Sequence, residues 1–231
     1  VYDASLPLEH FYTNATVPCP GAEHILLSFP MRFLPERTLS TEGMDYPGKG
    51  LSDAVFMSSR DGVHWDRTFP QAWVRPGRDQ RNWTHRSCTP AVGLVETSPD
   101  EWSMYIAENY GWNTNLIRRI TLRPHGFASV RAGYHGGEMV TKPLVFAGNT
   151  LRLNFSSSAA GSIAVEVQDE SGNPMEGRAL SDFDVAYGDD LDRVATWQGS
   201  SAIGNLAGQP VRLRFQLTDA DLYAIRVAEE A

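Results

Sequence analysis

Three carboxylates stand where strand-like runs of the chain begin or end. Asp53 follows Gly50-Leu51-Ser52 and begins an apolar run, Glu96 ends another, and Glu108 ends a third, just before Asn109-Tyr110-Gly111. Cleavage of a glycosidic bond uses two carboxyl groups, one protonated and one ionised, on opposite sides of the bond. We therefore take Glu108 and Asp53 as candidate catalytic residues.

Each candidate also has a structural interpretation. Glu108 could bond a nearby loop or an arginine such as Arg118 or Arg119, and Asp53 could cap the start of its strand by accepting backbone amides. Asp61 is at the tip of an Asp-Gly turn, where an aspartate usually bonds its own turn backbone. We expect Asp61 to be structural.

Polar and aromatic side chains gather near these acids. Asn109 and Tyr110 follow Glu108 directly, and the stretch Arg81–Ser87 contains Trp83 and His85. Amides and hydroxyls suit hydrogen bonding to sugar hydroxyls, and indole rings suit stacking on sugar faces. The predicted substrate-binding residues are therefore Trp83, His85, Asn109, Tyr110 and Trp112. The alternatives are a solvent-facing loop position for His85 and buried packing for the two tryptophans.

The two cysteines and a cluster of acidic residues each allow two interpretations. Cys19 and Cys88 could form one disulfide or remain two separate buried thiols, and neither has metal-ligand spacing. Acidic residues cluster in a second region, where they predict either a structural Ca²⁺ site or a solvated acidic face. These are Asp182, Asp184, Asp189, Asp190 and Asp192, with the pair Asp219 and Asp221. No other metal and no cofactor is expected.

The pattern of nearly every segment is typical of a β-strand. The elements that position the candidate site residues are therefore predicted to be strands. A hairpin is expected from 53–58 and 63–69 around Asp61-Gly62, because glycine takes a positive φ without steric cost. Further strands are expected at 24–33, 90–97, 101–108, 116–122 and 127–132. After these come 140–146, 150–155, 161–169, 193–197, 211–217 and 222–227. No amphipathic helix of ten or more residues is evident. The class is therefore all-β.

Charge and composition divide the chain near residue 132. Residues 1–131 carry 13 basic and 14 acidic side chains, net −1, whereas 132–231 carry 7 and 14, net −7. The first part has strand groups recurring at about 45–50 residues, the length of a propeller blade. The second alternates apolar and polar residues, which is typical of a sandwich. We predict blades of a β-propeller over 1–131 and a jelly-roll-like β-sandwich over 132–231.

The bulk composition excludes some partners. The 231 residues have a net charge of −8, which argues against nucleic acid, and no apolar run is long enough for a transmembrane helix. Only Lys49 and Lys142 are lysines, a skew towards arginine that favours a GC-rich bacterial source. No signal peptide is evident, so either a leader has been removed or the chain is a piece of a longer polypeptide.

Several segments together resemble bacterial proteins, common in planctomycetes, that are described as like glycoside hydrolase family 32. They are Phe11-Tyr12-Thr13-Asn14-Ala15, the hairpin 52–65 with its Ser-x-Asp-Gly-x-x-Trp pattern, Gly126–Val130, Gly137–Leu144 and Asp219–Tyr223. The resemblance covers nearly the whole chain. It implies a five-bladed β-propeller followed by a β-sandwich, of which this chain would be the C-terminal half.

The resemblance also implies a function. It implies a secreted or periplasmic carbohydrate-active hydrolase, with part of the site supplied by an N-terminal propeller half from the same or another chain. Asn14 is a further predicted substrate-binding residue. The family's nucleophile-type Asp is expected on blades that this sequence lacks. The alternatives are a non-catalytic carbohydrate-binding or cell-surface protein, and a structural subunit that completes a partner's sheet.

Overall fold

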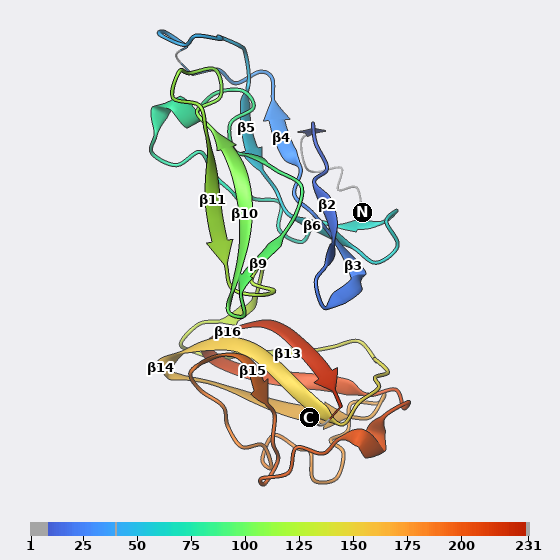
Figure 1. Ribbon diagram of the computed structural model, residues 1–231. Helices are drawn as coiled ribbons and strands as arrows, with labels where there is room; N and C mark the ends of the chain where they lie inside the picture. Colours follow the sequence, from blue (N-terminus) through green and yellow to red (C-terminus); the bar gives the residue numbers. More distant parts are fainter. Residues whose placement is uncertain (1–8, 40, 230–231) are drawn as a thin grey trace. The chain divides into compact units, whose positions relative to one another are not determined.

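The computed structural model describes residues 9–39 and 41–229, and it is an all-β protein. Strands hold 48% of the residues and helical turns 3%, which confirms the predicted class. The chain divides into two compact units, Val1–Leu122 and Arg123–Ala231 (Figure 1). The sequence-based boundary lies a few residues later, at 131/132.

The described residues of unit 1 form three small antiparallel sheets. One has the order β1-β4-β5, another the order β2-β3-β6-β7, and in the third β10 pairs with β8, β9 and β11. The strands are β1 His10–Phe11, β2 Thr16–Cys19, β3 Ala22–Ser28, β4 Met31–Leu34, β5 Leu51–Ala54, β6 Met57–Ser59, β7 Trp65–Asp66, β8 Thr89–Pro90, β9 Val95–Ser98, β10 Glu101–Glu108 and β11 Leu116–Leu122. One short 3₁₀ turn, η1 at Gln80–Asn82, precedes Trp83.

The chain changes sheet inside two apolar runs that were predicted to be single strands. The run 24–33 divides between β3 and β4, and the run 53–58 divides between β5 and β6. The crossing points are as apolar as the strands, since Phe29 and Val55 are fully buried. The Val55 amide donates to the Pro30 carbonyl at 3.1 Å, so the two crossings run beside each other. The prediction of two unbroken strands was wrong because uniform burial hides the break.

The predicted hairpin is present but short. Ser59 pairs with Trp65, and the second strand is β7 alone rather than the whole of 63–69. Asp61 Oδ1 accepts from the amides of Val63 and His64 at 2.8 and 2.7 Å. The structural role expected of Asp61 is confirmed by these bonds.

Unit 2 is built on one curved antiparallel sheet that forms a half-barrel. Its strands are β12 Val130–Ala132, β13 Gly137–Val140, β14 Thr150–Gln168, β15 Asp189–Val194 and β16 Arg212–Ala228, and a 3₁₀ turn, η2, lies at Gly204–Leu206. β14 and β16 pair along most of their length, where the sequence predicted two shorter strands each. The pairing register shifts between Ser157 and Ser162, where a Cβ on Gly161 would lie 2.4 Å from the Asp219 carbonyl oxygen. The strands continue through a bulge that glycine permits.

The core of unit 2 lies within the curve of this sheet. Its largest fully buried side chains come from β14, β16 and the segment after β15: Leu151, Leu153, Phe155, Ile163, Trp197, Leu213, Phe215 and Leu217. Trp197 is 1% exposed and donates from Nε1 to the Val165 carbonyl at 2.9 Å. Alternating residues of the long strands thus supply most of one apolar cluster.

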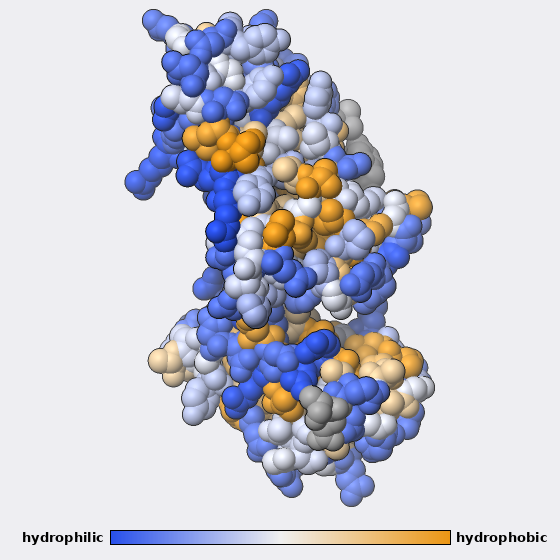
Figure 2. Space-filling model, in the orientation of Figure 1, coloured by the Kyte–Doolittle hydropathy of each residue, from blue (hydrophilic) through white to orange (hydrophobic). Residues whose placement is uncertain are grey.

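The surface of unit 1 carries scattered apolar side chains. Figure 2 shows hydrophobic patches among mostly hydrophilic residues on the visible face. Phe11, Tyr12, Tyr46 and Ile117 are among the exposed large side chains of this unit. Within 9–39 and 41–229, no helix has the length and hydropathy needed to cross a membrane.

Candidate functional site

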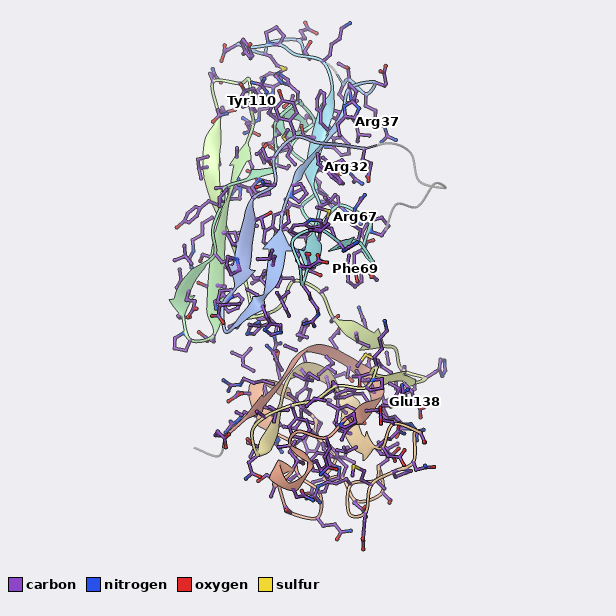
Figure 3. All side chains as sticks on the ribbon, turned by 90° about the vertical axis from the view of Figure 1, so that its right-hand side faces the viewer. Arg32, Arg37, Arg67, Phe69, Tyr110 and Glu138 are labelled. Carbon is purple, nitrogen blue, oxygen red and sulfur yellow. The ribbon has the colours of Figure 1, made fainter. Side chains whose placement is uncertain are left out.

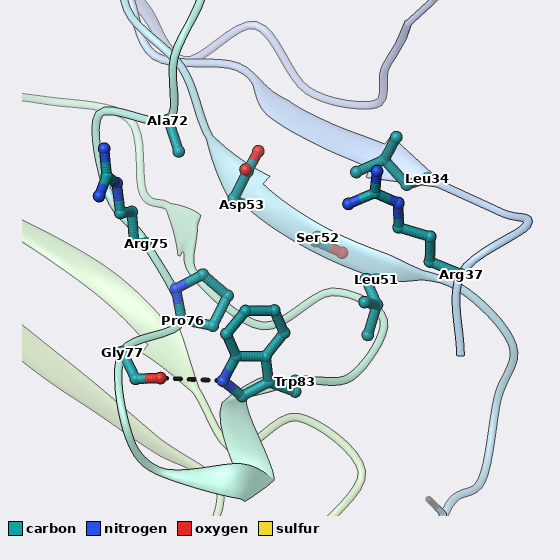
Figure 4. A pocket seen from close by; sticks show the side chains of 10 residues that line it. All are labelled: Leu34, Arg37, Leu51, Ser52, Asp53, Ala72, Arg75, Pro76, Gly77 and Trp83. Atoms are coloured by element: carbon teal, nitrogen blue, oxygen red, sulfur yellow. Dashed lines mark hydrogen bonds between the residues drawn. The ribbon is translucent and has the colours of Figure 1, made fainter. Parts of the chain in front are cut away.

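A pocket of about 450 Å³ in unit 1 brings together Asp53 and Trp83, two of the predicted site residues. It is lined by Leu34, Arg37, Leu51, Ser52, Asp53, Ala72, Arg75, Pro76, Gly77 and Trp83 (Figure 4). The lining therefore combines an apolar wall with a carboxylate, an indole ring and two guanidinium groups. Its size is suited to a small organic ligand.

Asp53, which lines this pocket, is held by a two-point ion pair. Arg32, directly opposite on β4, donates from Nε to Asp53 Oδ1 at 2.8 Å and from Nη2 to Oδ2 at 2.6 Å. Hydrogen bonding to Asp53 is the main reason that the pKa of Arg32 is raised. The pair is only 14–15% exposed, so the carboxylate is fixed in orientation by a charge-assisted fork.

The network extends to a second carboxylate, Glu9. Arg32 Nη1 lies 2.7 Å from Glu9 Oε1, and Arg67 Nη2 lies 2.5 Å from Glu9 Oε2. Burial raises the pKa of Glu9, but the hydrogen bonds from Arg32 and Arg67 outweigh it, and the pKa is lowered overall. Figure 3 shows Arg37, Arg32 and Arg67 one after another along the same side of unit 1.

Trp83 forms a fixed aromatic wall of the pocket. It follows η1 directly, and its Nε1 donates to the Gly77 carbonyl at 2.9 Å (Figure 4). Asp79 accepts from the Arg81 amide at 3.0 Å and so caps the turn that leads to Trp83. The ring is thereby oriented before any ligand binds, which lowers the entropic cost of stacking.

Glu108 lies at the end of β10 and does not line the pocket. Its Oε2 accepts from Arg118 Nε at 2.7 Å, the arginine pairing considered from the sequence. Glu96, on β9, is exposed. The two candidate catalytic carboxylates thus belong to different sheets, and each has an arginine partner.

His85 and Tyr110 form an aromatic cluster with Tyr46. The His85 and Tyr110 rings meet edge to face at 5.2 Å, and the Tyr46 ring lies 6.2 Å from His85. His85 is 7% exposed, and a Cβ on Gly48 would lie 2.2 Å from its Nε2. The solvent-facing alternative for His85 was therefore wrong, because a glycine lets the loop close over the ring.

This cluster is joined to the pocket through Ser52. The Arg86 amide donates to Ser52 Oγ at 2.6 Å, and Arg86 Nη1 donates to the Tyr110 hydroxyl at 2.8 Å. Arg86 has φ +62°, a conformation that is uncommon for residues other than glycine. Ser52 and Asp53 are neighbours on β5, so their side chains point to opposite faces of the sheet. The aromatic cluster and the ion-pair network therefore lie on opposite faces of β5.

The remaining predicted residues are Asn14, Asn109 and Trp112. Asn14 Oδ1 accepts from the Thr16 amide at 3.3 Å. Asn109 is 3% exposed with φ +55°, and its amide donates to Asn82 Oδ1 at 2.9 Å. Asn109 Oδ1 and Trp112 Nε1 are buried without a hydrogen-bond partner in the described part of the chain. None of these three predicted residues lines the described pocket.

The two cysteines are separate buried thiols, the second of the two alternatives. The pKa of Cys88 is raised to about 12, mainly by burial and in smaller part by the negative charges of Glu108 and Asp53. The negative charges of both candidate carboxylates therefore contribute to the pKa of the same thiol.

The acidic residues of unit 2 have separate partners. Asp189 pairs with Arg123 at 2.6 Å, and Asp192 pairs with Arg152 and Arg226 at 2.8 and 2.7 Å. Over residues 9–39 and 41–229, no group of three or more His, Cys, Asp and Glu side chains is arranged to hold a metal ion. The Ca²⁺ alternative thus has no ligand set in the described residues.

Among the charged residues of this region that sequence reasoning missed are Glu9, Arg32, Arg37 and Arg75. One signal was available for Arg32, a charge inside the apolar strand Met31-Arg32-Phe33-Leu34. Such a charge needs a partner when the strand is buried. The other three come from loops and from a segment next to the chain start, and no pattern marks them.

No protein-family model matched the chain, and comparisons with curated proteins and with solved structures gave no match either. The resemblance to proteins like glycoside hydrolase family 32 therefore stays a prediction.

Proposed function

We propose that the chain recognises carbohydrate, with a sugar ring bound in the pocket between Trp83 and Asp53. The observation that carries the proposal is the oriented indole of Trp83 in a pocket that also contains a fixed carboxylate. A sugar has one apolar face that stacks on an aromatic ring and hydroxyls that bond charged side chains. Trp83 and Asp53 supply these two contacts.

We also propose a propeller followed by a sandwich as the architecture of the chain. The three small antiparallel sheets of unit 1 support an assignment to the later blades of a five-bladed propeller, and the curved sheet of unit 2 supports a jelly-roll-like sandwich. On the sequence resemblance, the chain is the C-terminal portion of a secreted or periplasmic glycoside hydrolase-like protein. The other blades then come from the same protein or from a partner.

Hydrolysis is the second candidate function, and one observation favours it. The segment 86–88 links the strands of Asp53 and Glu108: the Arg86 amide donates to Ser52 Oγ, next to Asp53, and the Cys88 amide donates to the Ala107 carbonyl, next to Glu108. A hydrolase needs two carboxyl groups about 5–10 Å apart. The test is whether the chain cleaves a bound oligosaccharide. Cleavage that is lost in Asp53→Asn and also in Glu108→Gln would establish hydrolysis. Binding without cleavage would support recognition only.

Replacement of Trp83 by alanine tests the binding proposal. We expect a loss of affinity of about tenfold, because a stacked aromatic ring contributes about 1 kcal/mol beyond the area it buries. The measurement is titration of the full chain with a panel of neutral and acidic oligosaccharides, followed calorimetrically. Trp83→Phe keeps a ring and should restore part of the affinity.

Tyr105→Ala is the matched control, because Tyr105 is an exposed aromatic of unit 1 on β10, outside the pocket lining. It should bind like the native chain. Equal affinities for Trp83→Ala and Tyr105→Ala, in variants with native circular dichroism, would exclude this pocket as the sugar site.

A further inference from the structure

Two guanidinium groups of the pocket are unpaired. Arg37 and Arg75 both line it, from the loop after β4 and from the segment before η1 (Figure 4). Both are exposed, and in the described part of the chain neither side chain has a hydrogen bond or an ion pair. Among the described residues, ten other arginines form ion pairs with carboxylates, whereas these two are free to bind a ligand.

The carboxylate in the pocket does not neutralise them. Both oxygens of Asp53 are already bonded by Arg32, which also pairs with Glu9, and Glu9 in turn pairs with Arg67. This network holds two negative and two positive charges and is therefore neutral as a whole. The charges of Arg37 and Arg75 remain, which makes the pocket electropositive in a chain of net charge −8.

Such a pocket selects a ligand with an anionic group. The planar fork of arginine donates two parallel hydrogen bonds to two oxygens of a carboxylate or a sulfate, whereas a neutral hydroxyl has a single oxygen and cannot match this geometry. The apolar wall of Leu34, Leu51 and Pro76 reduces the local dielectric and strengthens the attraction. The hydroxyls of a neutral sugar could accept hydrogen bonds from these guanidinium groups but would not compensate their charges.

We propose that the pocket binds an acidic sugar, a uronic acid or a sulfate ester, with the ring on Trp83 and the anionic group between Arg37 and Arg75. This inference rests on the proposed function, since it names the ligand class of the same pocket. The carboxylate and the sulfate share the chemistry that the two arginines recognise, and the experiment distinguishes them.

The test compares three probes that differ only at C6: glucose, glucuronate and glucose 6-sulfate. Each is titrated into the full chain and followed by tryptophan fluorescence. At least one acidic probe should bind tenfold or more tightly than glucose, and the one that binds tighter identifies the anionic group. The preference should shrink as salt is added, because the arginines are exposed.

The variant Arg37→Gln/Arg75→Gln should lose this preference and bind the acidic probes no more tightly than glucose. Arg78→Gln is the matched control, because Arg78 is exposed and close in sequence to Arg75 but does not line the pocket. It should keep the preference.

The possible failures have different meanings. Equal binding of all three probes, with binding still dependent on Trp83, would overturn the acidic-sugar inference and leave carbohydrate recognition in place. A preference that survives the double variant would also overturn it. Binding of none of the probes or of the oligosaccharide panel would overturn the proposed function itself.

Discussion

Replacement of Arg32 by methionine is expected to lower the free energy of unfolding of unit 1 by about 3 kcal/mol. Arg32 bonds both oxygens of Asp53 and one oxygen of Glu9, and it also donates to the Pro70 carbonyl at 3.0 Å. The three charged side chains are only 12–15% exposed. Methionine fills a similar volume but leaves two carboxylates without their main partner in a poorly solvated site. The loss is measured by urea unfolding, followed by the fluorescence of the tryptophans, five of which lie in unit 1.

Arg119→Met is the matched control for this prediction. Arg119 also pairs with a carboxylate in unit 1, that of Glu101, but the two side chains are 47% and 38% exposed. An exposed pair contributes between 0 and about 1 kcal/mol, so this variant should be close to native. If the two variants lose the same stability, the Arg32 network is an ordinary surface feature.

The pH dependence gives a second signature of the same network. The pKa of Glu9 is lower in the folded chain than its usual value of 4.5, so its contribution to stability is present above that value and is lost as the pH falls towards the folded pKa. In Arg32→Met the pKa of Glu9 should be lowered less, because the hydrogen bond from Arg32 is lost. The stability difference between native chain and Arg32→Met should therefore narrow between about pH 6 and about pH 3. If the stability difference between the two chains does not change with pH, the effect of Arg32 does not depend on the ionisation of Glu9.

The strands of unit 1 could be predicted where their boundaries carry turn residues. β10 and β11 match the ranges expected from Ser98-Pro99-Asp100 and Tyr110-Gly111. The prediction failed at Phe29 and Val55, where the chain passes from one sheet to another without any polar residue. Turn signals mark exposed corners, whereas a buried crossing has to be apolar.

In unit 2 the opposite error occurred. Alternation identified the strand residues of β14 and β16, but polar and small residues such as Ser156–Ser158 were interpreted as ends of strands. Ser156 and Ser157 still pair with Asp221 and Ala220, and the bulge of this long strand follows them, between Ser157 and Ser162. A bulge and a turn draw on the same residue types, so only the pairing register distinguishes them.

The candidate site was predicted in its parts but not in its arrangement. Asp53 and Trp83 were both selected for residue type and local context, and both line the pocket. Glu108 was selected by the same reasoning and lies outside it. The pairing of Arg32 with Asp53 depends on the register of β4 against β5, across a long loop. Long-range register of this kind is set by packing and leaves no local pattern.

The second large effect is expected in unit 2, where Trp197→Ala should lower the free energy of unfolding by about 4 kcal/mol. The indole is 1% exposed and packs edge to face on Phe183, with ring centroids 5.3 Å apart. Its removal leaves a cavity that the long paired strands β14 and β16 cannot easily close, and the Val165 carbonyl loses its Nε1 donor. Arg178, whose Cζ lies 5.4 Å from the ring centroid, loses a cation–π contact as well.

Tyr187→Ala separates this core effect from the general loss of an aromatic residue. Tyr187 belongs to the same unit and is 73% exposed, so its replacement should change stability by no more than about 0.5 kcal/mol. Both variants are compared by urea unfolding followed by far-ultraviolet circular dichroism, because Trp197→Ala removes the tryptophan of this unit. If Trp197→Ala costs no more than Tyr187→Ala, the curve of the sheet closes around the missing ring. In that case the half-barrel would be held by the pairing of β14 with β16 rather than by the side chains that it encloses.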